Sequence, residues 1–189
     1  RMLATAASRL GLKTHIYCAE SGPAFDVATR TTKAPFNDTA ALTQFARAVQ
    51  AVTYEFENVP IATAQHLAGL VPVCPSAKAL EVAQDRLVEK QFISALAIPV
   101  APFHAIDDAA GLRAALGRFA APAILKTRRF GYDGKGQAGT APGGDPASAW
   151  AEISAHAAVL EKRIPFALEI SALVARGVAG ELAFYDCPA

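Results

Sequence analysis

Apolar and polar positions follow two periods along the first third of the chain, one typical of helices and one typical of short strands. The period of about 3.6 residues predicts helices, and short apolar runs between turn residues predict strands. Gly11 is a suitable stop for the first helix, Asp38 or Thr39 caps the second, and Pro60 begins the third. The predicted helices are residues 2–10, 39–49 and 61–67, and the predicted strands are 13–18, 51–54 and 71–74. Strands separated by helices indicate a parallel sheet covered on both faces.

The pattern changes near residue 76, where two helical segments follow each other and strands then become frequent. We predict helices at residues 76–82, 84–96, 107–119 (capped by Asp107) and around Trp150, and strands at 99–105, 123–127, 159–162, 166–175 and 182–185. The fold class is therefore α/β, with an α+β second part. We expect an N-terminal parallel-sheet, Rossmann-like domain over residues 1–76 and a second domain over residues 77–189.

Composition and charge exclude several classes of protein. Apolar residues make up 52% of the 189 residues and charged residues 19%, which is typical of a folded chain. The formal net charge of +1 gives no overall attraction for nucleic acid or an anionic membrane surface. No apolar run reaches the ~20 residues that cross a bilayer, and no leader pattern opens the chain. The three cysteines have no metal-ligand or disulfide spacing, which favours the reducing cytoplasm.

The strongest candidate for chemistry is the segment of residues 124–137. An apolar strand ends at Lys126, and glycines follow at 131, 134, 136 and 139. Glycine lets backbone N–H groups turn toward an anion, and lysine supplies a compact charge for phosphate oxygens. The cations of this segment are Lys126, Arg128, Arg129 and Lys135. The spacing is not that of an ordinary P-loop. A flexible basic hairpin loop explains the same composition, so the residues alone leave both interpretations open.

A second candidate lies in residues 159–171, where an apolar strand ends in a polar run and Pro165 redirects the chain. Such a junction exposes backbone groups that could bind an adenine edge. Glu169 stands among apolar residues, where an unpaired carboxylate would be costly to bury. Either a ribose diol or an arginine such as Arg176 would satisfy it.

Two further segments carry paired charges. At a strand period of two, Glu55 and Glu57 project to the same side, at the end of a parallel strand where α/β sheets bind ligands. A solvated strand edge is the alternative. In residues 84–92, Arg86 and Lys90 share a helix face, which requires either a bound anion or a neighbouring carboxylate such as Asp85 or Glu89.

Together these segments resemble the ATP-grasp superfamily, and within it the enzymes that carboxylate 5-aminoimidazole ribonucleotide. The resemblance spans nearly the whole chain. It rests on residues 1–3, 53–60, 84–86 with Lys90, 126–137, 160–177 and 184–188. The run Gly-Tyr-Asp-Gly-Lys-Gly-Gln at residues 131–137, combined with Thr-Tyr-Glu-Phe-Glu-Asn-Val at 53–59, makes it specific.

The resemblance implies a pre-ATP-grasp domain followed by an ATP-grasp lid domain that holds ATP. The implied ATP-binding residues are Arg86, Lys126, Gly131, Tyr132, Asp133, Gly134, Lys135, Gly136, Gln137, Glu161, Lys162, Arg163, Ile164 and Glu169. Within this set, Arg86 and Lys126 would contact phosphates, residues 161–164 would clasp adenine, and Glu169 would bind the ribose. Asp133 and Lys135 are the implied catalytic residues. Glu55, Glu57, Tyr132 and Lys135 are the implied substrate-binding residues.

The implied reaction uses ATP to phosphorylate bicarbonate, and the carboxyphosphate then carboxylates the amine of 5-aminoimidazole ribonucleotide. This step belongs to purine biosynthesis. The resemblance also implies Mg²⁺, whose carboxylate ligands we expect beyond residue 189, and a cytoplasmic homodimer. It further implies a glycine-rich loop before Arg1. We therefore expect residues 1–189 alone not to complete turnover. The alternatives are another ATP-grasp ligase, such as a formate-dependent glycinamide ribonucleotide transformylase, and an inactive nucleotide-binding fragment.

Overall fold

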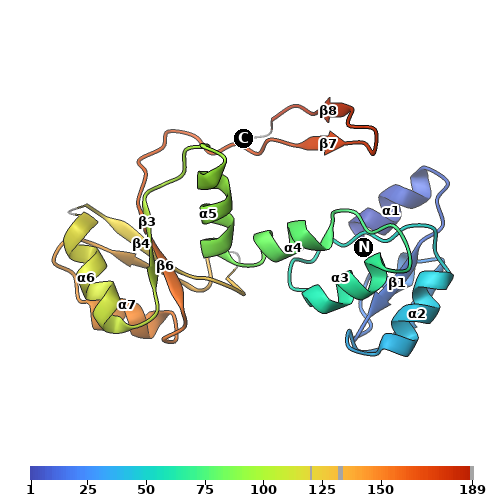
Figure 1. The fold of residues 1–189 in the computed structure, drawn as a ribbon, viewed down its shortest axis with the longest axis horizontal. Coiled ribbons are helices and arrows are strands. Elements are labelled where there is room, and N and C mark those ends of the chain that lie inside the picture. The colour runs from blue at the N-terminus through green and yellow to red at the C-terminus, as the bar shows by residue number, and fades with distance from the viewer. Residues whose placement is uncertain (120, 132–133, 188–189) are drawn as a thin grey trace.

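The chain forms two bodies joined end to end through one helix in a computed structural model that describes residues 1–119, 121–131 and 134–187 (Figure 1). The first body carries α1 (Met2–Arg9), β1 (His15–Cys18), the 3₁₀ turn η1 (Phe25–Val27), β2 (Arg30–Lys33), α2 (Thr39–Arg47) and α3 (Ile61–Ala68). The connecting helix α4 (Ala77–Ala83) leads into α5 (Arg86–Ala95), and the second body begins there.

The first body is built on parallel pairing, as the sequence predicts. Strands β1 and β2 run parallel, with His15 opposite Arg30. The apolar faces of α2 and α3 form one core, whose buried members are Leu42, Phe45, Ala46, Val52, Leu67 and Val71. Asp38 caps α2 by accepting a hydrogen bond from the Ala41 amide at 2.9 Å. The cap and the three helices are therefore confirmed.

Two of the strands predicted in this body are reduced to a single bridge in the structure. Residues 51–54 and 71–74 meet only at one parallel bridge, between Val52 and Val73. Pro72 has no N–H and Pro75 follows at once, so the pairing cannot extend. Strand β2 was not expected, because its four residues are polar and mostly exposed and show no apolar alternation.

The second body is a four-stranded antiparallel sheet with helices on one face. Its elements are β3 (Phe103–Ile106), α6 (Ala109–Phe119), β4 (Ala123–Thr127), β5 (Gln137–Thr140), α7 (Pro146–Glu152) and β6 (Ala158–Lys162). The strand order is β3-β6-β4-β5, and every pairing is antiparallel. The two helices α6 and α7 pack on the same side and bury Leu112, Leu125, Ile153 and Leu160. Trp150 lies in α7 and packs against this core, as predicted.

The end of the chain departs from the prediction. Within residues 166–175 only the end is strand, because β7 spans Val174–Arg176 and pairs with β8 (Leu182–Phe184) in a two-stranded hairpin. An apolar run forms a strand only where a partner ladder exists, and residues 166–173 have none. Glu169 is consequently exposed, so the argument that its carboxylate is costly to bury is wrong.

One capping residue is also corrected. Asp107 was the predicted cap of the helix at residues 107–119. The structure begins α6 at Ala109, and Asp108 accepts a hydrogen bond from the Gly111 amide at 2.7 Å. The two aspartates are adjacent, and only the second is correctly placed to receive an N–H of the first turn.

Candidate functional site

One face of the second sheet is closed by helices, and the opposite face carries polar side chains. Along β4 the burial alternates, with Leu125 and Thr127 buried and Ile124 and Lys126 partly exposed. Because strand side chains alternate between faces, Ile124 and Lys126 lie on the face away from α6 and α7. The antiparallel register places Glu161 of β6 opposite Ile124 on that same face. The polar face therefore presents a lysine and a glutamate from neighbouring strands.

Two lysines hold the Glu161 carboxylate. Lys126 Nζ lies 3.1 Å from Glu161 Oε2, and Lys90 Nζ, which reaches down from α5, lies 3.4 Å from Oε1. The Lys90 ammonium also stands 5.6 Å from the centre of the Phe103 ring. These three charged side chains are mostly buried, with 23%, 16% and 10% exposure for Lys126, Lys90 and Glu161. The cluster carries a net charge of about +1 on a partly desolvated surface, which suits an anion.

The glycine-rich loop after β4 packs tightly against Thr127. The Thr127 amide donates to the Gly136 carbonyl at 2.8 Å. A Cβ at Gly136 would lie 2.5 Å from Thr127 Oγ1, and one at Gly131 would lie 3.0 Å from the same oxygen. Gly134 and Gly136 also have positive φ, at 80° and 68°. Glycine is therefore required by both space and backbone conformation at position 136.

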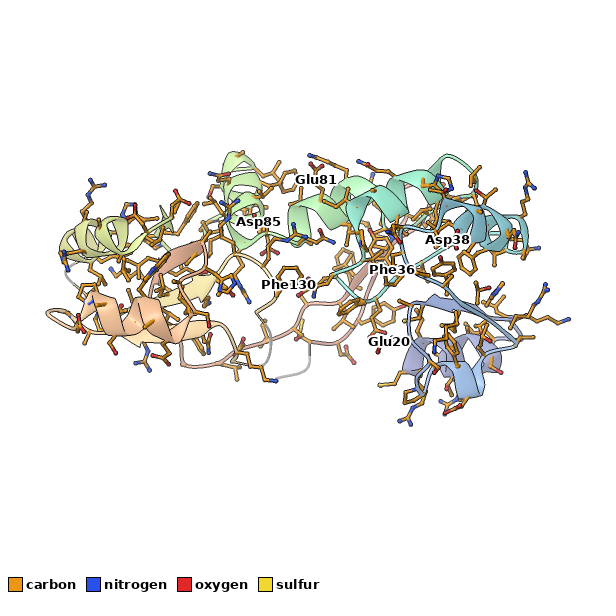
Figure 2. The ribbon with its side chains drawn as sticks, turned by 90° about the horizontal axis from the view of Figure 1, so that it is seen from below. Glu20, Phe36, Asp38, Glu81, Asp85 and Phe130 are labelled. Atoms are coloured by element: carbon orange, nitrogen blue, oxygen red, sulfur yellow. The ribbon has the colours of Figure 1, made fainter. Side chains whose placement is uncertain are left out.

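The turn between α4 and α5 holds the start of this loop (Figure 2). Asp85 binds the Arg128 guanidinium through both carboxylate oxygens, with a shortest distance of 2.6 Å. Arg86 donates from its amide to the Arg128 carbonyl at 3.0 Å and from its side chain to the Gly131 carbonyl at 3.2 Å. Burial raises the pKa of Asp85, but hydrogen bonds from Arg128 and from the first amides of α5 outweigh it, so the net pKa lies below the ordinary value. Asp85 was one of the carboxylates predicted to compensate Arg86 and Lys90, but in the structure it binds Arg128.

Gln84 and Glu89 connect this region to the first body. The Gln84 amide nitrogen donates to the carbonyls of Glu57 and Val59, and its oxygen accepts from Arg129. Burial raises the pKa of Glu89 against the opposing effect of Arg86 and Lys90, and the charge of Glu57 adds to the rise. Residues 55–59 of the first body therefore lie next to the turn that holds the loop.

A cavity of about 580 Å³ joins the polar face to the loop and to the end of β6. It is lined by Ile124 of β4, Gly134 and Gln137 of the loop, Thr140 of β5 and Arg163. Arg163 follows β6, and its amide donates to the Pro122 carbonyl at 2.9 Å. Lys162 and Ile164 are exposed beside it. Gly134 and Gln137 of the predicted loop and Arg163 of the predicted segment 161–164 thus line one cavity.

The three other predicted glutamates are all exposed to solvent. Glu55 and Glu57 are both exposed, and Glu55 lines a cavity of about 1640 Å³ in the first body together with Tyr54 and β1. Glu169 is exposed in the segment before β7 and lines neither cavity. Tyr132 and Asp133 lie outside the described residues, so the structure says nothing of their predicted roles.

Several residues of this region were not predicted as site residues. They are Gln84, Lys90, Thr127, Arg128 and Arg129. The first four contact a predicted residue, which is Glu57, Glu161, Gly136 and Arg86 in turn, and Arg129 contacts Gln84. Arg128 and Arg129 were noted as cations and residues 84–86 as part of a motif. Arg128 and Arg129 lie more than 40 positions along the chain from their partners Asp85 and Gln84, so local sequence spacing gave no signal for these contacts.

In residues 1–119, 121–131 and 134–187, no group of three or more His, Cys, Asp or Glu side chains could hold a metal ion. No helix among these residues is long and apolar enough to pass through a membrane. The cysteines Cys18, Cys74 and Cys187 are free thiols.

An open sheet face with a lysine at the end of a strand, and a glycine-rich loop folded back beside it, define an ATP-grasp type of nucleotide site. The sequence agrees: a model of the ATP-grasp domain matches residues 91–189, and a model of the ribonucleotide synthetase preATP-grasp domain matches residues 1–84. The chain belongs to the ATP-grasp family.

Within this family, the chain is similar to several proteins of purine synthesis. The chain is 43% identical over 189 residues to the N5-carboxyaminoimidazole ribonucleotide synthase of Brucella melitensis, covering 98% of this chain and 52% of that protein. It is 44% identical over 190 residues to a bifunctional purine synthesis protein of Dictyostelium discoideum, covering 97% of this chain and 19% of that protein. The solved N5-carboxyaminoimidazole ribonucleotide synthetase of Thermus thermophilus superposes with a TM-score of 0.86 at 41% identity, over 98% of this chain and 50% of that one.

A second solved synthetase of the same name, in complex with ADP, superposes with a TM-score of 0.91 at 32% identity, again over 98% of this chain and 50% of that one. The chain thus spans about half the length of the synthases it matches, and 19% of the bifunctional protein.

Proposed function

We propose that this chain is the nucleotide-binding part of an ATP-dependent carbon–nitrogen ligase that converts 5-aminoimidazole ribonucleotide and bicarbonate to 5-(carboxyamino)imidazole ribonucleotide. The observation that carries the proposal is the arrangement of Lys126 and the glycine-rich loop on one open sheet face. The names of the relatives and the ADP bound to one of the solved synthetases support the same reaction.

Each candidate residue is assigned a part of the nucleotide according to its position on the sheet face. Lys126 and Arg86 supply charge to the phosphates, and the Gly131–Gln137 segment covers them. The cavity shared by Ile124, Gln137 and Arg163 takes the rest of the nucleotide, beside the chain of residues 161–164. In this assignment Glu161 acts from its side chain as the partner of Lys126, and its neighbours at 162–164 present backbone groups to the base.

The chemical logic of the loop is exclusion of water. Carboxyphosphate is a short-lived acyl phosphate, and a closed loop that keeps water away protects it until the amine reacts. Lys135 and Asp133 belong to this loop and are proposed to act next to the reacting groups. Cations at Arg86 and Lys126 neutralise the charge that develops on the transferred phosphoryl group.

The amine substrate is assigned to the first body. Glu55 lines the large cavity there, whereas the Glu57 carbonyl is held by Gln84, so Glu55 is the better candidate to contact 5-aminoimidazole ribonucleotide. Glu169 as the ribose partner rests on the resemblance alone. A domain boundary at residues 76–77, at the start of α4, a homodimer and a cytoplasmic location complete the proposal. The magnesium requirement stays a prediction, and no step above depends on it.

The test is the reaction of the protein at its natural length. We expect ADP release that requires both 5-aminoimidazole ribonucleotide and bicarbonate. Release that requires formate and glycinamide ribonucleotide would identify the transformylase type instead. Nucleotide binding without release under either condition would identify a nucleotide-binding protein with no ligase activity.

A further inference from the structure

A single buried amide connects the candidate substrate segment to the candidate nucleotide loop. Gln84, the last residue before the α4–α5 turn, is only 5% exposed. Its Nε2 donates to the Glu57 carbonyl at 2.6 Å and to the Val59 carbonyl at 2.5 Å. Its Oε1 accepts from Arg129 Nη2 at 2.8 Å. Both donor hydrogens and the acceptor oxygen are therefore in use.

The partners of this amide belong to the two halves of the proposed site. Residues 55–59 include Glu55, which lines the cavity of the first body. Arg129 begins the loop that carries the glycines, and its guanidinium stands 5.4 Å from the centre of the Phe130 ring. Figure 2 shows Phe130 at the junction of the two bodies, near Asp85. A shift of either segment would leave a buried carbonyl or amide of this contact without its partner.

We propose that Gln84 is a positioning residue that links the substrate segment (residues 55–59) to the described part of the nucleotide loop (residues 128–131 and 134–137), so that the two segments change their arrangement together. Occupation of one site then favours the arrangement that the other site binds. This inference rests on the proposed function, because it names two ligands. It adds a residue that touches neither of them and acts through Arg129 and through the carbonyls of Glu57 and Val59.

Three variants separate the two halves of the contact. Gln84→Glu keeps an acceptor for Arg129 but loses both donors to residues 57 and 59. Arg129→Met keeps those donors and removes the charge on the loop side. Gln84→Leu removes both halves at similar volume. The matched control is Gln91→Leu, which removes an exposed amide on the neighbouring helix α5.

The measurement is the dissociation constant of a non-hydrolysable ATP analogue, determined by calorimetry with and without saturating 5-aminoimidazole ribonucleotide. We expect the unmodified protein and Gln91→Leu to bind the analogue about 5- to 100-fold more tightly when the ribonucleotide is present. Gln84→Glu, Arg129→Met and Gln84→Leu should each lose most of that factor. For the two Gln84 variants, the affinity for the analogue alone should change by less than about threefold, which is below 1 kcal/mol. Arg129→Met is compared by its coupling factor only, because Arg129 belongs to the candidate anion segment.

A residue with only a structural role would weaken each ligand separately and leave the coupling factor intact, and that result would overturn the inference. The inference would also be overturned if Gln84→Glu lost the coupling and Arg129→Met kept it. The Gln84 amide would then act only through its contacts with the first body. If the unmodified protein binds both ligands without mutual effect, the inference is wrong and the proposed function survives. If it binds neither ligand, both are wrong. Thermal unfolding of each variant identifies any that fails to fold, and the two single-half variants then decide the question.

Discussion

Replacing Gly136 with alanine tests the packing of the glycine-rich loop most directly. The residue has φ of 68°, and a Cβ there would stand 2.5 Å from Thr127 Oγ1 and 3.3 Å from its Cγ2. The left-handed conformation costs a non-glycine residue about 1–2 kcal/mol. Forcing an extra methyl group into a packed region costs about 1–3 kcal/mol more. We therefore expect Gly136→Ala to lower the free energy of unfolding by about 2–5 kcal/mol.

The chain provides a control that isolates the first of these costs. Gly143 has φ of 77°, and a Cβ there would meet nothing within 4 Å. Gly143→Ala should therefore show the conformational cost alone. The excess for Gly136→Ala, about 1–3 kcal/mol, corresponds to about 2–12 °C in the melting temperature of a chain of this size.

A double-mutant cycle assigns the excess to one contact. Thr127→Ala removes both Oγ1 and Cγ2, so Gly136→Ala should cost about as much as Gly143→Ala in that background. The assay is urea unfolding of the four variants, followed by calorimetry with an ATP analogue. The reasoning is refuted if Gly136→Ala costs no more than Gly143→Ala, or if removing the threonine side chain leaves the cost unchanged.

Three further substitutions address the charges of the site. Lys126→Met should weaken binding of an ATP analogue by about 10- to 100-fold in calorimetry, because a charged hydrogen bond to phosphate is worth about 1.5–3 kcal/mol; unchanged affinity would remove Lys126 from the site. Asp85→Asn keeps the helix cap but loses the charge that binds Arg128. Because the folded-state pKa of Asp85 is lowered, its stabilising effect is present above the unfolded value of 3.8 and is lost as the pH falls through the folded pKa. Chemical unfolding should therefore show a loss of stability for this variant at neutral pH that shrinks in acid, and a constant loss would contradict the argument. Glu89→Gln should have the opposite effect on stability. The folded-state pKa of Glu89 is raised above 4.5, so ionisation of this carboxyl group opposes folding. The variant should therefore be more stable than the unmodified protein at neutral pH, and this gain should vanish as the pH falls to 4.5. Destabilisation at neutral pH would show that the Glu89 charge is needed.

The sequence predicted the elements that depend on local chemistry. The cap at Asp38, the strand at residues 123–127 and the helix that contains Trp150 all follow from neighbouring residues, and the structure confirms them. The predictions that were wrong needed distant partners. The apolar run at residues 166–175 has a pairing ladder only at its end. The polar residues 30–33 form a strand because β1 offers them a parallel neighbour.

The candidate site shows the same division. Residue type and order made Lys126 and the glycines candidates for an anion site, with a basic hairpin loop as the alternative. The assignment of Asp85 to Arg128 could not be found in this way. Asp85 and Glu89 were both available to Arg86 and Lys90, and the actual partner of Asp85 is Arg128, which lies 43 positions later in a loop that faces the α4–α5 turn. The resemblance to ATP-grasp enzymes supplied roles for these residues, but it did not supply their partners.

The ion cluster on the sheet face shows how an anion site can be stable before its ligand binds. Two ammonium groups side by side would repel on a partly buried surface, and Glu161 between Lys126 and Lys90 removes most of that cost. When a phosphate group approaches Lys126, Glu161 keeps Lys90 as its counter-ion, so no buried carboxylate is left uncompensated. A site with Lys126 and Glu161 alone would have to break its only ion pair to bind an anion. In the proposed site, the third charge, which α5 brings from outside the sheet, would therefore lower the free-energy cost of exchanging partners at Lys126.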